Sequence, residues 1–408
     1  MSSKKGVLGA IQEYSLPLIA GVFAALYAAN SHSEWYQAFI EEPIVDGWAL
    51  LGHPLSLSFL VNDIFMVLFF GIAAKEITDA VLPGGSLNPP SKAINPLLGT
   101  IGGVVGPVGV FFLMVNMFYA GEPNYAEVAN GWGVPTATDI ALAWLAARIV
   151  FGAKHPAVNF LLLLAVADDA IGLGIIAVFY PDPNHPVAPI NLLWTAGGMA
   201  AALGMRMMKV QSWVPYILIG GTLSWLGLIT AYLHPALALV FIVPFLPALR
   251  PQMGLVSEED DPGGPTDAHA HAHDTALENF EHFFKTFVDY GLFAFAFANA
   301  GVAFANMGAL TWTILGSLII GKTIGIFGCS FIGVKMGFPL PDGMNLRSLT
   351  VAGLVAGLGL TVALFVAGEA YPDPGLQGEA KMGALFSGGV FLLAIIVGKV
   401  LRIEKVGD

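Results

Sequence analysis

Two adjacent acids, Asp168 and Asp169, lie in the middle of the apolar run LLLLAVADDAIGLGIIAV. Burying two like charges in a low-dielectric environment is costly. At least one of these carboxylates should therefore bind a proton there. The other species that favours such oxygen ligands is a small, hard cation. A pair of this kind can take up protons at one face of a membrane and exchange them for a cation at the other.

Four further ionisable residues interrupt apolar runs: Asp63, Glu76, Asp139 and Lys322. An ionisable side chain in a spanning helix is costly, and by default it marks an ion or proton pathway. The alternative is a set of internal ion pairs that only hold helices together, and for Asp63 and Glu76, near the ends of their run, it stays open. That alternative is disfavoured for the aspartate pair. Neighbouring helical residues point about 100° apart, so one lysine cannot readily neutralise both.

The composition indicates what positions these groups. The chain has 408 residues, of which 56% are hydrophobic and 11% charged, with a mean hydropathy of +0.73. Soluble domains have about 25% charged residues. A net charge of -12 and a single cysteine exclude a nucleic-acid binder and a disulfide scaffold. The lone Cys329 has apolar neighbours, and no nucleophile–base pair lies near an aqueous face, so we expect no enzyme.

The apolar runs predict an all-α polytopic membrane protein. A spanning helix takes about 20 residues, so the chain has room for about twelve. The runs exceed strand length and lack the alternation of a β-barrel. The predicted spans are 16–29, 57–82, 96–119, 132–149, 157–180, 190–205, 214–230, 235–249, 287–305, 312–332, 348–370 and 383–400.

The basic residues predict the orientation, because cytoplasmic loops carry the excess of Lys and Arg. With the N-terminus inside, nearly all of them fall in cytoplasmic segments, Lys381 alone lies in an outer loop, and Lys322 lies within a span. Both termini should then be cytoplasmic. Lys4 and Lys5 before an apolar run would also suit a cleaved signal peptide, but the charge distribution favours keeping this helix.

Two spans contain residues that break helices. Gly133 and Pro135 would interrupt the fourth span, and Gly357 and Gly359 would loosen the eleventh. Paired interrupted helices in two halves of a transporter indicate inverted repeats with an ion site at their crossing. We expect spans three to five and ten to twelve to form such repeats.

Two polar stretches lie between spans. Residues 31–54 are long for an outer loop and predict a short hairpin or an interfacial helix. Residues 251–274 form a cytoplasmic loop with an acidic run followed by His269, His271 and His273. Alternating histidines can bind a metal or sense pH, while a solvated linker is the other interpretation of this loop.

Four motifs in this order resemble the NhaA family of bacterial sodium/proton antiporters over nearly the whole chain. They are ATDIA at 137–141, the Asp168-Asp169 pair, FAFANAG at 295–301 and GKTIGI at 321–326. The resemblance implies crossed, discontinuous fourth and eleventh helices. It also implies an ion-transporting core (residues 94–186 and 307–408) that moves against a dimer-forming panel (residues 1–93 and 187–306) in the bacterial inner membrane.

The resemblance also implies roles for particular residues. Asp169 would be the principal sodium ligand with Asp168 beside it, Lys322 would pair with Asp168, and Thr138 would add an oxygen. Asp139 would offset the positive ends of the broken helices, and the 31–54 loop would form a homodimer. The candidate pH-sensing or funnel residues are Glu76, Glu281, His282, Asp63 and His234.

We therefore expect an electrogenic, pH-dependent antiporter without a cofactor, which exports Na⁺ or Li⁺ in exchange for about two H⁺. The alternative is a sodium-coupled symporter of an organic anion on the same scaffold. A membrane sensor that uses the histidine loop is a third hypothesis, and it would not require Asp169.

Overall fold

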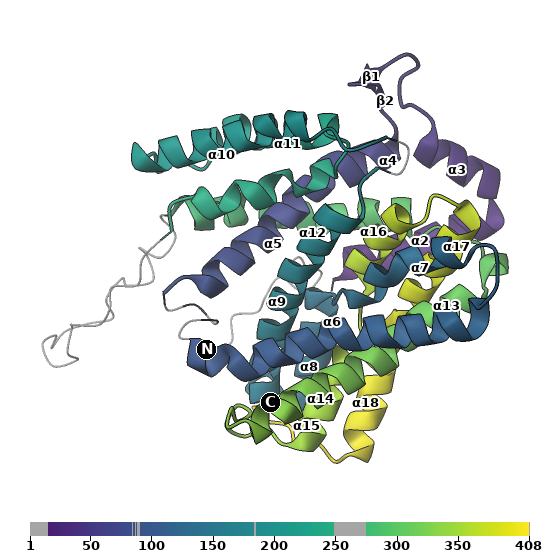
Figure 1. The fold of residues 1–408 in the computed structure, drawn as a ribbon, viewed down its shortest axis with the longest axis vertical. Coiled ribbons are helices and arrows are strands. Elements are labelled where there is room, and N and C mark those ends of the chain that lie inside the picture. Colours follow the sequence, from purple (N-terminus) through teal and green to yellow (C-terminus); the bar gives the residue numbers. More distant parts are fainter. Residues whose placement is uncertain are drawn as a thin grey trace, which may run out of the picture.

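A computed structural model describes residues 15–83, 85, 87, 90–182, 185–248 and 275–407. These residues are mostly helical, in agreement with the predicted class, and their single sheet is a two-stranded hairpin. The histidine loop lies outside the described residues. The helices and strands of Figure 1 are α2 (Leu16–Ser31), α3 (Ser33–Glu41), β1 (Ala49–Leu50), β2 (His53–Pro54), α4 (Leu57–Phe59), α5 (Met66–Val81), α6 (Pro90–Tyr119), α7 (Tyr125–Asn130), α8 (Ile140–Phe151), α9 (Pro156–Phe179), α10 (Leu192–Met207), α11 (Thr222–Thr230), α12 (Ala276–Asn299), α13 (Ala309–Gly316), α14 (Lys322–Lys335), α15 (Leu346–Val355), α16 (Leu360–Ala370), α17 (Pro374–Phe386) and α18 (Val390–Val400).

Five helical segments of the described chain are long and apolar enough to cross a membrane. Some of them join α-helices through short π- or 3₁₀-helical turns, as at Leu60–Phe65 and Ser317–Gly321. Two bent helix pairs bring the number of possible spans to seven. The total of twelve spans and the division into core and panel stay predictions. The five spans are Leu57–Val81, Ala93–Tyr119, Pro156–Phe179, Ala309–Lys335 and Pro374–Val400.

The two bent pairs are interrupted where proline and glycine predicted breaks. Tyr125–Thr136 and Ile140–Phe151 meet at 52°, and Leu346–Val355 and Leu360–Ala370 meet at 49°. The breaks touch each other, since the Asp139 amide donates to the Leu358 carbonyl at 2.6 Å. Backbone groups that the helices leave unpaired are thus satisfied across the two interruptions.

The predicted span 235–249 is not one α-helix. Within its described part the chain forms two 3₁₀ segments, Pro235–Phe241 and Val243–Phe245. Pro244 and Pro247 supply no backbone N–H and clash with the preceding turn, which disfavours an α-helix in the second half of the segment. Hydrophobicity alone predicted the segment and does not distinguish an α-helix from 3₁₀ turns.

The 31–54 segment contains both predicted elements. Helix α3 is followed by the β1–β2 hairpin, in which Ala49 pairs with Pro54 and Leu50 with His53. Figure 1 shows this hairpin projecting beyond the helices. Its strands are exposed, and a role in dimer formation stays a prediction.

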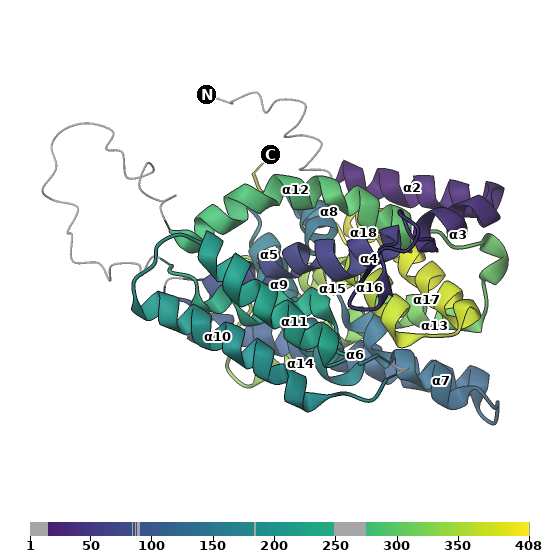
Figure 2. The ribbon, with the colours of Figure 1, turned by 90° about the horizontal axis from the view of Figure 1, so that it is seen from above.

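Glycines let α6 and α14 approach closely. A Cβ atom on Gly102 would collide with the Gly325 backbone, and one on Gly106 with the backbones of Gly321 and Gly325. The two helices therefore pack backbone to backbone, side by side in Figures 1 and 2. This contact fixes the position of Lys322, which directly follows Gly321 and begins α14.

Replacing Gly325 with leucine should destabilise the protein by separating α6 from α14. Overpacked sites cost about 1–3 kcal/mol, and here the added side chain meets backbone that cannot move aside. Gly328→Leu is the matched control, because a Cβ atom there meets nothing within 4 Å. Thermal unfolding of the purified protein should show a lower midpoint for Gly325→Leu than for Gly328→Leu. Equal midpoints would contradict the close packing.

Candidate functional site

Asp168 and Asp169 lie at the middle of α9 and are almost completely buried, with exposed fractions of 1% and 9%. Helix α9 begins with His155 as its N-cap and Pro156 in the first turn, a position where a missing N–H costs nothing. Its leucines and alanines are strong helix formers. The helix therefore continues through the acids and holds both in the protein interior.

Lys322 pairs with one of the two acids. Its Nζ lies 2.5 Å from Asp168 Oδ2 and also donates to the Thr136 carbonyl at 2.6 Å and to Thr138 Oγ1 at 2.9 Å. The side chains of Lys322 and Asp168 are both fully buried. An ammonium group has three donors, and all three are used here.

Asp169 has no such partner. Its Oδ1 is buried without a hydrogen bond, and so is Oδ1 of Asp168. Buried polar atoms nearly always have a partner, so an orphaned carboxylate oxygen indicates a ligand or proton that belongs there. Because the donors of Lys322 are occupied, Asp169 is the carboxylate that remains available.

A cavity of about 180 Å³ adjoins Asp169. Asp169 lines this cavity together with Thr138 and Thr361, one from each of the two broken helix pairs. Glu76 of α5 and Asp289 of α12 also line it. Carboxylate, hydroxyl and carbonyl oxygens are the ligands of hard cations. The oxygens around this cavity are therefore of the type that a hard cation would use.

Asp139 joins the two breaks. Its Oδ1 caps α8 by accepting from the Leu142 amide at 3.1 Å, and its Oδ2 accepts from the amide of Thr361 at 3.2 Å and from the Thr361 hydroxyl. The N-termini of α8 and α16 carry partial positive charge, so one carboxylate compensates both. Asp139 itself is 3% exposed.

Replacing Asp139 with alanine should loosen both broken pairs. Loss of an N-cap alone costs about 1 kcal/mol, and the Thr361 hydroxyl and amide also lose their acceptor. Asp139→Asn keeps an acceptor oxygen and should lose less stability. Hydrogen exchange measured by mass spectrometry should increase at residues 139–142 and 359–363 in the alanine variant. An increase at α8 alone would show that Asp139 does not couple the breaks.

One of the predicted pH-sensing residues, Glu281, belongs to an ion-pair network near the C-terminal end of α5. Glu281 on α12 pairs with Lys75 and, at 2.7 Å, with Lys285, while Lys75 reaches Asp79 at 2.7 Å. Glu76 lines the Asp169 cavity beside this network, and His282 follows Glu281 on α12. This network therefore borders the cavity that adjoins Asp169.

The structure does not place Asp63 and His234 with that network. They line a separate cavity of about 280 Å³, where His234 Nε2 lies 3.3 Å from Glu369 Oε2. Asp63 and Glu76 are thirteen residues apart on nearly continuous helix, a rise of about 20 Å. The five predicted residues therefore form two groups at opposite ends of α5. Sequence reasoning missed Glu369, although an acid near the end of the eleventh span was a signal for it.

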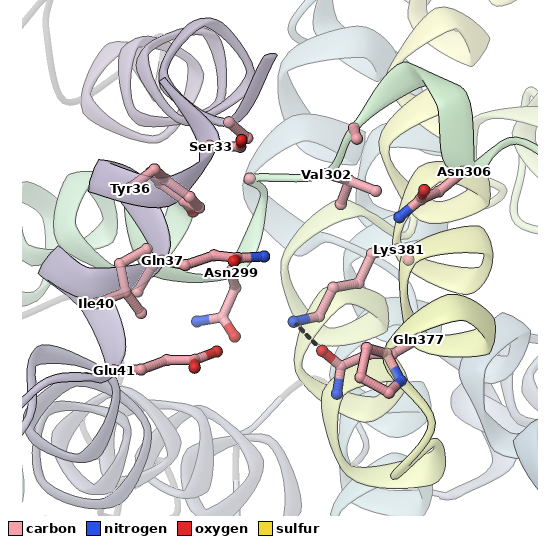
Figure 3. A pocket seen from close by; sticks show the side chains of 16 residues that line it. Ser33, Tyr36, Gln37, Ile40, Glu41, Asn299, Val302, Asn306, Gln377 and Lys381 are labelled. Carbon is pink, nitrogen blue, oxygen red and sulfur yellow. Dashed lines mark hydrogen bonds between the residues drawn. The ribbon is translucent and has the colours of Figure 1, made fainter. Parts of the chain in front are cut away.

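Lys381 is not in an outer loop as predicted, because it lies in α17 within the span Pro374–Val400. The short PDPG turn that precedes it starts α17 early, so the helix includes the lysine. Its side chain lies in a cavity of about 200 Å³ and donates a hydrogen bond to Gln377 Oε1 at 3.0 Å. Figure 3 shows Glu41 of α3 on the opposite wall of this cavity. Helix α3, which forms part of that wall, is held to α12, because the Tyr36 hydroxyl donates to the Phe297 carbonyl at 2.5 Å.

Comparisons with known proteins agree with the geometry. The family described as Na⁺/H⁺ antiporter 1 matches residues 8–401. A Na⁺/H⁺ antiporter NhaA of Geobacter sulfurreducens is 55% identical over 97% of this chain and 98% of its own length. One of Desulfitobacterium hafniense is 56% identical over 100% and 99%, and one of a Jannaschia species is 42% identical over 97% and 98%.

Proposed function

The chain belongs to the Na⁺/H⁺ antiporter 1 family, as its motifs predicted, and from that premise we propose that it exchanges sodium for protons at the Asp168–Asp169 pair. The observation that carries this proposal is the asymmetry of the pair. Asp168 is held by Lys322, whereas Asp169 is buried beside a cavity without a partner. A multi-pass membrane protein with such a carboxylate has a site that either a proton or a bare alkali ion can occupy.

Sodium binding should release the ion pair. When Na⁺ binds Asp169, it also attracts Asp168 Oδ1, which lacks a partner, and it competes with Lys322 for that carboxylate. Thr138 hydrogen-bonds to Asp168 at 2.8 Å and to the Ala356 carbonyl at 3.0 Å, and so connects the site to both breaks. The site would then face alternate sides of the membrane as the core moves against the panel.

Two protons should replace each sodium ion. One would bind Asp169, and the other would be shared between Asp168 and Lys322. The exchange then moves one net charge, which corresponds to about 2.3 kcal/mol per 100 mV of membrane potential.

Proteoliposomes with an imposed potassium-diffusion potential test this stoichiometry. Sodium transport should accelerate when the potential drives the net charge in the direction of exchange. Transport that is insensitive to voltage would contradict the two-for-one exchange.

Activity should rise with pH, because protons compete with sodium for the same oxygens. Below the pH at which Asp169 loses its proton, sodium cannot bind.

We place the protein in the bacterial inner membrane with both termini in the cytoplasm, as a homodimer formed through the 31–54 loop, with Li⁺ as a second transported ion. The lining of the site argues against the organic-anion symporter. Four acids (Glu76, Asp139, Asp169 and Asp289) line the cavity against one cation, Lys285, which is already paired with Glu281, and this excess of negative charge would repel an anion.

A further inference from the structure

An apolar groove of about 580 Å³ lies between α2 and helices α8, α16, α17 and α18. We call it the α2 groove. Its lining consists of aliphatic and aromatic residues, one methionine and two glycines, and includes Leu26, Leu142, Leu360 and Phe391. No acid, amide or base lines it, in contrast to the cavities at Asp169, Asp63 and Lys381.

The α2 groove opens where lipid surrounds the protein. Helices α17 and α18 form a candidate span, and α2 is a shorter apolar helix that packs along α12. Phe23 on α2 and Leu392 on α18 lie at the groove and are 69% and 65% exposed. Side chains this apolar and this exposed face hydrocarbon in a membrane protein.

The size of the α2 groove suits a hydrocarbon chain. Apolar cavities exclude water, and one of about 150 Å³ binds benzene. A groove of about 580 Å³ therefore has room for several times the carbon atoms of benzene. Left empty, it would deprive its lining of packing contacts, and the bilayer offers acyl chains to restore them.

Charge at one end of the groove complements a phospholipid headgroup. Arg148 lies three residues beyond Leu145 on α8, and Lys399 lies seven residues beyond Leu392 on α18, rises of about 4.5 Å and about 10 Å. Leu145 and Leu392 line the groove, and the C-terminal ends of α8 and α18 lie together, since a Cβ atom on Gly398 would lie 2.7 Å from the Val150 side chain. Both cations therefore lie past the same end of the groove, where a headgroup phosphate would attract them.

The groove also contacts the second helix break. Leu358 and Leu360 line it on either side of Gly359. The Leu358 carbonyl accepts from the Asp139 amide, and the Gly359 amide donates to Ser387 Oγ at 3.2 Å. A molecule in the groove would therefore contact Leu358 and Leu360. The backbone of Leu358 is one of the groups that hold the two broken pairs together.

We propose that the α2 groove binds one acyl chain of a membrane phospholipid, with the headgroup phosphate beside Arg148 and Lys399, and that the bound chain supports the break at Ala356–Gly359 during transport. The effect on transport rests on the proposed function. The binding itself does not.

Photocrosslinking tests the binding. The protein is reconstituted into vesicles of phosphatidylethanolamine and phosphatidylglycerol that contain a phospholipid with a diazirine on its acyl chain, and labelled peptides are mapped by mass spectrometry. Labelling should concentrate on residues 19–26, 142–145 and 385–392. Labelling spread evenly over lipid-facing helices would overturn the proposal.

Filling the groove should displace the lipid. Gly389 lines the groove, is exposed, and leaves an added Cβ without a neighbour within 4 Å. Gly389→Leu should reduce groove labelling several-fold, and Gly388→Leu, which has the same free space, serves as a second variant. Gly197→Leu on α10 is the control, since it is equally exposed and open but lies outside the groove. Unchanged labelling in both groove variants would overturn the proposal.

Transport by the same variants tests the coupling. The sodium-dependent rate of Gly389→Leu should differ several-fold from that of Gly197→Leu, and equal rates would overturn the coupling to the break. If the wild-type protein labels in the groove but exchanges no sodium for protons, the proposed function fails while the lipid site stands.

Discussion

Replacing Asp169 with asparagine should abolish sodium-dependent proton exchange and leave the protein folded. Asparagine has nearly the shape of aspartate, but it cannot be ionised, so it neither attracts Na⁺ nor binds the exchanged proton. Because the Asp169 side chain makes no hydrogen bond or ion pair with the described residues, no partner is left unpaired by the change. Sodium-induced proton movement in proteoliposomes should fall to the level of protein-free vesicles.

An exposed aspartate provides the control for this experiment. Asp342 lies on the surface away from the cavity, so Asp342→Asn should transport at the wild-type rate. Asp168→Asn should also lose exchange, because the second proton has no site. Exchange by Asp169→Asn at a substantial fraction of the wild-type rate would show that the ion binds elsewhere.

Replacing Lys322 with alanine should strongly destabilise the protein. The side chains of Lys322 and Asp168 are fully buried and lie 2.5 Å apart. Removing one partner of a buried pair leaves an uncompensated charge and costs about 3–5 kcal/mol. The thermal midpoint of the purified protein should therefore fall well below that of Lys335→Ala, which removes a lysine from the exposed end of the same helix.

A double variant separates stability from transport. Asp168→Asn combined with Lys322→Met removes both charges and keeps similar volumes, so it should recover much of the stability that Lys322→Ala loses. It should not recover exchange, because the two groups that share the second proton are gone. If Lys322→Ala is as stable as Lys335→Ala, the buried ion pair does not hold α9 to α14.

The sequence indicated the site because a charged residue within a buried apolar segment is rare and therefore points to a function. In a chain with so few charged residues, Asp168, Asp169, Asp139 and Lys322 were exceptional, and the structure brings all four together. Pro135 and Gly357 similarly located the two breaks, since these residue types disturb helices through their own backbone chemistry. Local signals of this kind need no knowledge of which helices are neighbours.

Other features depend on packing between distant segments, which one sequence does not reveal. The third donor bond of Lys322 goes to the Thr136 carbonyl, 186 positions away, and a backbone acceptor leaves no sequence signal. The segregation of Asp63 and His234 from Glu76 follows from the length of α5. Lys381 was misplaced because one lysine at a span boundary fits a loop and a helix end equally well.

Proton release on sodium binding tests the central claim most directly. The purified protein is held in weakly buffered detergent solution near neutral pH, and NaCl is added in the presence of a pH indicator, with choline chloride as the salt control. The wild-type protein should release protons as Na⁺ binds, up to about two per ion, and Asp169→Asn should release none. Saturable sodium binding to the wild-type protein without proton release would contradict a shared site for the two ions.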